Sequence, residues 1–143
     1  MPTELRRVIT ADGVFLDGAL TTPTVAATSN LPVDAFLLVH GTGSNFYAAG
    51  VLETFSQQAT EAGHAVIRIN TRGHDGVSSI STSQGSVAGG AAYETIADCR
   101  FDLHAWLDDL VSLGYSRIAL VGHSMGAVKS ILTTATQPHP AVR

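Results

Sequence analysis

One serine in this sequence stands where a serine can become a nucleophile. The pentapeptide around it has the pattern G-x-S-x-G and reads Gly122-His123-Ser124-Met125-Gly126. An apolar run over 117–122 precedes Ser124, and a segment with helical spacing over 125–136 follows it. A sharp strand-to-helix turn of this kind lifts the serine hydroxyl above a sheet. Gly122 and Gly126 have to be small because they crowd the strand and the helix. We therefore expect Ser124 to attack a carbonyl carbon.

A second stretch could stabilise the anion that such an attack creates. The apolar run 35–40 leads into a glycine-rich loop, His40-Gly41-Thr42-Gly43. Small residues allow the backbone to come close to a bound carbonyl and direct an N–H group at it. The N–H of Met125 lies at an expected helix N-terminus, where free donors and the helix dipole favour negative charge. The amides of Thr42 and Met125 together would form a two-donor oxyanion hole.

Four polar residues near these motifs are expected to support the site and not to transfer protons. His40 precedes the oxyanion loop and is expected to brace it. His123 lies in the turn and is expected to point away from the serine hydroxyl as a packed or hydrogen-bonded side chain. His74 and Asp75 could form a base–acid pair, but adjacent side chains are expected to diverge.

Other candidates have simpler explanations. Asp98 and Asp102 are spaced i, i+4 on an expected helix and are interpreted as part of a solvated face. Cys99 is expected to be a small packed residue. The segment containing Lys129 resembles a phosphate-binding loop, but Val128 replaces the glycine required before the lysine, so Lys129 is interpreted as an ordinary helix residue.

The composition excludes several classes of protein. The chain has 143 residues, 45% hydrophobic and 14% charged, with a formal net charge of −4. This charge does not favour nucleic-acid binding, and no run is long and apolar enough to span a membrane. One cysteine cannot build a disulfide framework, and no signal peptide is recognisable. We expect a cytoplasmic protein without a metal or an organic cofactor.

The order of the expected elements predicts the fold class. Two short runs, 5–10 and 14–21, are joined at Asp12-Gly13 and predict an antiparallel hairpin. The further expected strands are 35–40, 65–70 and 117–122, the expected helices are 50–62, 92–113 and 125–136, and the expected loops are 22–33 and 71–91. Alternating strands and helices predict an α/β fold with a mostly parallel sheet and crossover helices.

With these motifs in this order, the sequence resembles the α/β-hydrolase superfamily of serine hydrolases. The resemblance rests on HGTG at 40–43, NTRGHDGVS at 70–78 and GHSMG at 122–126. It implies the strand order 1-2-4-3-5. Asn70 stands where that family usually has Asp, and Asp75 where it usually has Gly, so 70–78 is interpreted as structural support for the floor of the site.

The proton-handling residues that the resemblance implies are missing from these 143 residues. In this superfamily an acid and then a histidine follow the nucleophile in chain order. No Asp or Glu follows Ser124, and the one later histidine is His139, directly after the last expected helix. We therefore expect residues 1–143 to be the N-terminal part of one hydrolase domain, as a fragment or a truncated gene product, with the acid and the histidine beyond residue 143.

The resemblance and the motifs predict a serine hydrolase that acts on a small-molecule carboxylic ester. A thioesterase, lipase, amidase or C–C hydrolase of the same fold remains open, because the turn and the oxyanion loop are common to all of them. A non-catalytic binding protein of the same fold also remains open.

Overall fold

The computed structural model describes residues 1–28 and 30–143 and is built around one five-stranded sheet. The strand order is β1-β2-β4-β3-β7, which confirms the predicted order. The strands are β1 (Thr3–Ile9), β2 (Phe15–Thr21), β3 (Ala35–Val39), β4 (Ala65–Ile69) and β7 (Ile118–Gly122). The β1–β2 and β2–β4 pairs are antiparallel, and β3 is parallel to both β4 and β7. The fold class is therefore α/β, as predicted.

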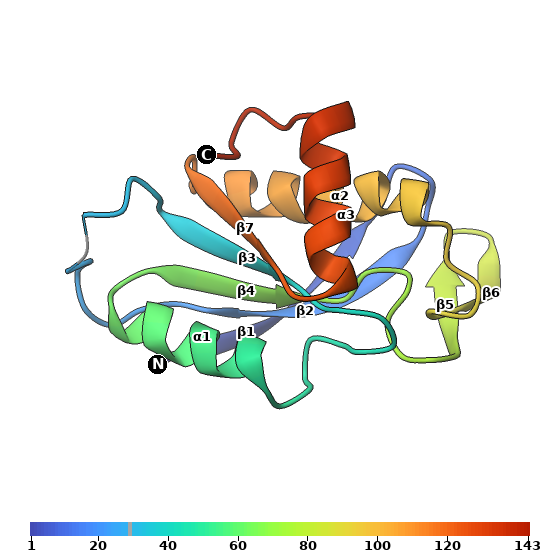
Figure 1. Ribbon diagram of the computed structural model, residues 1–143, viewed down its shortest axis with the longest axis horizontal. Coiled ribbons are helices and arrows are strands. Elements are labelled where there is room, and N and C mark those ends of the chain that lie inside the picture. Colours follow the sequence, from blue (N-terminus) through green and yellow to red (C-terminus); the bar gives the residue numbers. More distant parts are fainter. Residues whose placement is uncertain (29) are drawn as a thin grey trace.

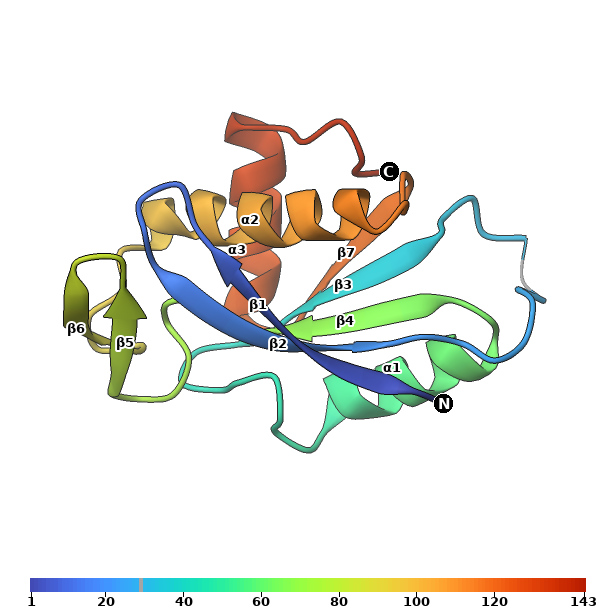
Figure 2. The same cartoon turned by 180° about the vertical axis from the view of Figure 1, so that it is seen from behind.

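Three helices cover the two faces of this sheet. They are α1 (Val51–Glu61), α2 (Cys99–Ser112) and α3 (Met125–Thr136). Helices α2 and α3 lie on one face and α1 lies on the other (Figure 1, and from behind in Figure 2). The chain moves one way along the sheet from β3 through α1 to β4, and the other way from β4 through α2 to β7. Because such crossovers are right-handed, α1 and α2 lie on opposite faces.

The central strands bury both of their faces. Along β3, Leu37 and Val39 join the apolar cluster beneath α2, while Phe36 and Leu38 join the smaller cluster beneath α1. This alternation follows from the two-residue period of a strand. The run is apolar at every position because helices cover the sheet on both sides, as is typical of parallel strands. Trp106 of α2 is fully buried in the larger cluster.

Two sequence predictions about the segment between β4 and α2 are wrong. The expected loop over 71–91 contains a small hairpin, β5 (Ser78–Thr82) and β6 (Gly85–Gly89). Ile80 is the only buried apolar side chain in β5 and β6. The sequence of this hairpin therefore lacks the alternation of apolar and polar residues that would predict two strands. The helix expected from residue 92 begins as a 3₁₀ turn at Ile96–Asp98, because Thr95 is extended (φ −98°, ψ 122°).

The outer edge of β7 is paired at one end. Ile118 donates its N–H to the Ala141 carbonyl (2.7 Å) and accepts from Arg143 N–H (3.0 Å), which makes a parallel bridge with Val142. The remainder of β7 is half-buried. In the part of the chain that the structure describes, no helix has the length and apolar character of a membrane span.

Candidate active site

Ser124 lies at the junction between β7 and α3 in an unusual backbone conformation. Its φ is 55° and its ψ is −124°. Among residues 1–28 and 30–143, Ser124 and Asp75 are the only non-glycine residues with positive φ. Such a conformation costs on the order of 1–3 kcal/mol and persists only when the surrounding structure imposes it. The residue is exposed, so its hydroxyl is accessible.

The two glycines of the pentapeptide allow this turn to pack. A Cβ atom at Gly122 would collide with the backbone of Gly126 and Ala127. A Cβ atom at Gly126 would collide with the carbonyl oxygens of Val39 and His40, at the end of β3. The start of α3 therefore lies directly against the end of β3, which is where the glycine-rich loop begins.

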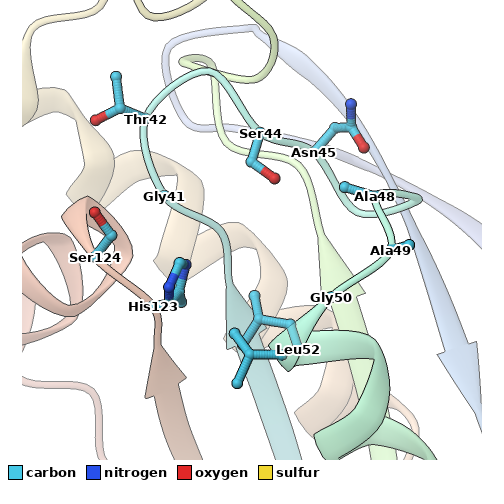
Figure 3. Close-up of a pocket in the computed structure, with 11 residues that line it drawn as sticks. Gly41, Thr42, Ser44, Asn45, Ala48, Ala49, Gly50, Leu52, His123 and Ser124 are labelled. Carbon is cyan, nitrogen blue, oxygen red and sulfur yellow. The ribbon is translucent and has the colours of Figure 1, made fainter.

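The glycine-rich loop passes beside Ser124. A turn closes it through a hydrogen bond from Ser44 N–H to the Gly41 carbonyl (3.2 Å). A Cβ atom at Gly41 would lie 3.0 Å from the Cβ of Ser124. Figure 3 shows Ser124 beside the loop that carries Gly41 and Thr42. Within the described residues, neither Thr42 N–H nor Met125 N–H donates to a protein acceptor.

A cavity of about 430 Å³ opens beside Ser124. Its lining residues come from the glycine-rich loop, the start of α1 and the pentapeptide, and are Gly41, Thr42, Ser44, Asn45, Ala48, Ala49, Gly50, Val51, Leu52, His123 and Ser124 (Figure 3). Most of these side chains are small or aliphatic. The cavity therefore offers a largely apolar surface next to the hydroxyl of Ser124.

The side chain of His123 is not packed in the interior as predicted from its position in the turn. It is exposed, and it lines the cavity together with Ser124 (Figure 3). The expectation of a packed side chain is therefore wrong. His123 continues the alternation of Ala119 and Val121, whose side chains lie on the α1 face of the sheet. That face is open at this point, because the cavity lies there.

His40 is buried and engaged at both ring nitrogens. Its Nε2 accepts the N–H of Thr71 (3.1 Å), and its Nδ1 lies 2.8 Å from the Gly41 carbonyl, to which it donates when it carries the proton. The pKa of His40 is lowered to about 4, mainly by burial and also by the charge of the nearby Lys129, although the hydrogen bond with the Gly41 carbonyl opposes the shift. The imidazole is therefore neutral near pH 7, an arrangement that suits bracing and not proton transfer.

His74 and Asp75 form a hydrogen-bonded pair, contrary to the prediction from the sequence. The Nδ1 of His74 lies 2.8 Å from Asp75 Oδ2, so the expectation that the side chains diverge is wrong. Asp75 adopts a left-handed backbone conformation, with φ 60°. It also accepts from Asn45 Nδ2 (2.7 Å) and donates its own N–H to the Ser44 carbonyl (2.9 Å). The pair therefore holds the outer side of the glycine-rich loop, and neither residue lines the cavity.

Comparison with known proteins decides the family. The profile of the alpha/beta hydrolase family matches residues 36–143 of this chain, from β3 to the end. The chain belongs to the alpha/beta hydrolase family. The match includes the glycine-rich loop, the pair at 74–75 and the pentapeptide. A search of curated proteins found no match to this alpha/beta hydrolase chain.

Solved structures show the same fold at low sequence identity. An esterase from Pyrococcus furiosus, Pf2001, is 22% identical with a TM-score of 0.68, and the match covers 95% of this chain and 47% of that one. The alpha/beta hydrolase GrgF from Penicillium sp. sh18 is 17% identical with a TM-score of 0.71, covering 96% and 43%. A carboxyl esterase from Bacillus coagulans is 17% identical with a TM-score of 0.67, covering 98% and 42%. This chain therefore spans less than half the length of each of these proteins.

In this alpha/beta hydrolase chain, the predicted solvated face of α2 is partly buried. Asp102 is 0% exposed, so that prediction is wrong for this residue. It accepts three hydrogen bonds from Arg72, through the backbone N–H, Nε and one terminal nitrogen, at 2.8–2.9 Å. Burial raises the pKa of Asp102 to about 6, although these bonds with Arg72 oppose the shift. Cys99, in contrast, is buried as predicted.

His139, the one histidine after Ser124 in the sequence, contacts Asp108 and not Ser124. His139 lies 3.1 Å from Asp108 of α2 and packs edge-on against His104. It does not line the cavity beside Ser124. In the described residues, no group of three or more His, Cys, Asp or Glu side chains could hold a metal ion.

Proposed function

We propose that this protein is a serine hydrolase of small-molecule carboxylic esters, with Ser124 as the nucleophile. The observation that carries the proposal is the left-handed Ser124 at the end of β7, beside the glycine-rich loop and a cavity of about 430 Å³. Strained residues at the rim of a cavity are typical of catalytic positions. The esterases among the similar structures favour an ester substrate.

The proposed reaction proceeds through an acyl-enzyme. The Ser124 Oγ attacks the ester carbonyl carbon, and a histidine takes the hydroxyl proton. The carbonyl oxygen becomes an anion, which the N–H groups of Thr42 and Met125 stabilise. The intermediate then expels the alcohol, which receives the proton from the histidine. Water hydrolyses the acyl-serine by the same steps.

We propose that the acid and the histidine come from parts of the hydrolase domain other than residues 1–143. No Asp or Glu follows Ser124 here, and His139 is engaged with Asp108. The hydroxyl of Ser124 has no hydrogen-bond partner within the described residues, so nothing in this part of the fold activates it. A serine without a base is a poor nucleophile at neutral pH.

The test is covalent labelling of the full-length protein with a fluorophosphonate probe. We expect labelling of the wild type and its loss in Ser124→Ala. The matched control is Ser44→Ala, because Ser44 lines the same cavity and carries the same hydroxyl. Labelling that survives Ser124→Ala would overturn the assignment of the nucleophile. No labelling of the wild type would favour the non-catalytic binding protein.

The leaving group is tested separately with p-nitrophenyl butyrate, a butyryl thioester and butyryl p-nitroanilide. We expect hydrolysis of the oxygen ester to have the highest kcat/KM. A higher value for the thioester or the anilide would replace the esterase proposal by a thioesterase or an amidase, with the same nucleophile.

A further inference from the structure

A buried ion pair lies beneath the glycine-rich loop. Lys129 of α3 is 0% exposed, and its Nζ lies 2.6 Å from Glu94 Oε2, whose side chain is 4% exposed. The same Nζ donates to Thr71 Oγ1 at 3.0 Å. Gly73 leaves the space for this pair, since a Cβ atom at that position would collide with the Glu94 carboxylate. Three separate segments of the chain therefore converge on one ammonium group.

A contribution to folding stability does not by itself explain why Lys129 and Glu94 are charged and buried. Removing two charges from water is costly, and apolar residues of similar volume often fill such a site equally well or better. Other positions on α3 that face inward use small or uncharged residues, as at Gly126, Ser130 and Thr133. The charge at Lys129 therefore calls for a role that an apolar side chain could not fill.

The hydrogen bonds continue from this pair to the loop. Because Lys129 donates to Thr71 Oγ1, the hydroxyl proton of Thr71 is free to turn toward His40 Nε2, 3.3 Å away. Thr71 N–H donates to the same nitrogen at 3.1 Å. With two donors directed at Nε2, the proton of the neutral imidazole lies on Nδ1, which then donates to the Gly41 carbonyl at 2.8 Å.

The last bond in this chain acts on the peptide that links Gly41 and Thr42. The Gly41 carbonyl and the Thr42 N–H belong to the same planar trans peptide and point in opposite directions. Holding the carbonyl on the His40 side therefore directs the N–H away from it. A donor at the carbonyl also polarises the peptide and strengthens its N–H as a donor.

We propose that Glu94 and Lys129 are positioning residues, which act through Thr71 and His40 to direct the Thr42 N–H at the anion formed beside Ser124. The proposal rests on the proposed function, in which this N–H is an oxyanion donor. The lowered pKa of His40, caused first by burial and then by Lys129, is consistent with a neutral imidazole in this chain of bonds.

The main test is Lys129→Met in the full-length protein, with p-nitrophenyl butyrate as the substrate. Losing one oxyanion donor outright costs about 10²–10³ in kcat. A misdirected donor should cost less, so we expect kcat to fall about 10-fold to 100-fold. KM should stay within about twofold, because the donor acts on the transition state and not on the bound ester.

Two further variants separate positioning from loss of folding stability. Lys129→Met/Glu94→Gln removes both charges, so it should recover most of the lost stability while kcat stays low. Arg6→Met is the matched control, because it breaks the partly buried Arg6–Asp109 pair that joins β1 to α2. Its kcat should equal that of the wild type. A wild-type kcat in folded Lys129→Met, or its return in the double variant, would overturn the proposal.

A spectroscopic measurement keeps this test independent of the proposed function. In uniformly ¹⁵N-labelled protein, His40 should show the neutral Nδ1–H tautomer, and Lys129→Met should shift its nitrogens toward a mixture and move the Thr42 amide resonance. Unchanged His40 and Thr42 signals would overturn the positioning role. If the wild type shows no hydrolysis that depends on Ser124, the proposed function fails, and these signals still decide whether Lys129 positions the loop.

Discussion

The two faces of the sheet differ in how completely they are covered. On the α2 and α3 face, a large cluster that includes Leu37, Ile67 and Trp106 is fully buried. On the α1 face, the buried cluster of the described residues consists of Phe36, Leu38, Ala59 and Val66. The β7 side chains on that face, Ala119 and Val121, are only partly buried.

The polar side chains also differ between the two faces of the sheet. On the α2 and α3 face, buried charges are paired, as in Lys129–Glu94 and Arg72–Asp102. On the α1 face, the cavity beside Ser124 is lined by accessible side chains such as His123. One face therefore holds the glycine-rich loop in place, and the other face leaves room for a ligand next to the same loop. The predictions below test this division, from the largest expected effect to the smallest.

The largest effect is expected from two neighbouring leucines that face opposite sides. Leu37 is 0% exposed in the large cluster, and Leu38 is 1% exposed in the small one. We expect Leu37→Ala to lower the free energy of unfolding by about 3–5 kcal/mol and Leu38→Ala by about 2–3 kcal/mol, because the thinner layer relaxes more easily around a cavity. Urea unfolding of both variants measures the difference. Equal losses would show that the two faces are packed equally well.

A smaller effect is expected from one buried charge on the α2 face. Asp102→Asn should lower the free energy of unfolding by about 2–3 kcal/mol, because it leaves the buried part of Arg72 without its carboxylate. Asp12 still pairs with Arg72 and limits the loss. The matched control is Asp17→Asn in the exposed Arg7–Asp17 pair, which should cost less than about 1 kcal/mol. A cost for Asp102→Asn as small as that of the control would contradict the prediction.

The smallest effect is a difference in pH dependence at His40. Its pKa in the fold is about 4, below the ordinary histidine pKa of 6.5. Between these two values the unfolded chain binds a proton that the folded chain does not, so stability is complete above pH 6.5 and falls as the pH drops toward 4. The change at any one pH step is small, because the free energy of unfolding falls by at most about 1.4 kcal/mol for each pH unit in this range.

His40→Gln should remove this contribution of His40 to the pH dependence of stability. The free energy of unfolding, measured in urea at several pH values from 7 to 4, should fall less steeply in the variant than in the wild type. Asp102 has a raised pKa and acts in the opposite direction over the same range, so the comparison between wild type and variant isolates His40. Parallel pH curves would show that His40 is not buried as a neutral imidazole.

The sequence predicted the parts of this fold that depend on local pattern. The apolar runs of β3, β4 and β7 and the periodic residues of α2 identify elements that bury a face, and their alternation predicts the α/β class. The strand order that the structure has was implied by the resemblance to the α/β-hydrolase superfamily. The spacing in the pentapeptide predicts a sharp turn at Ser124, and the positive φ of that residue agrees with such a turn. Roles for Ser124, Thr42 and Met125 remain predictions.

The sequence missed the features that depend on segments far apart in the chain. A lysine on a helix and a glutamate in a turn look like surface residues, and only the packing of α3 against the 70–73 loop brings Lys129 and Glu94 together. Asp102 was misjudged for the same reason, because its partner Arg72 comes from another segment. The His74–Asp75 contact depends on the left-handed backbone at Asp75, and an Asp at a position usually held by Gly was the one available signal.

By itself, the sequence determined the order of strands and helices, the turn that exposes Ser124 and the small residues that let a loop approach it. These follow from side-chain periodicity and from local steric limits on the backbone, which neighbouring residues set. Tertiary structure decided which charges are buried, which histidine is braced and which face of the sheet stays open. Those outcomes depend on desolvation and pairing between residues that are distant in sequence, and no local pattern records them.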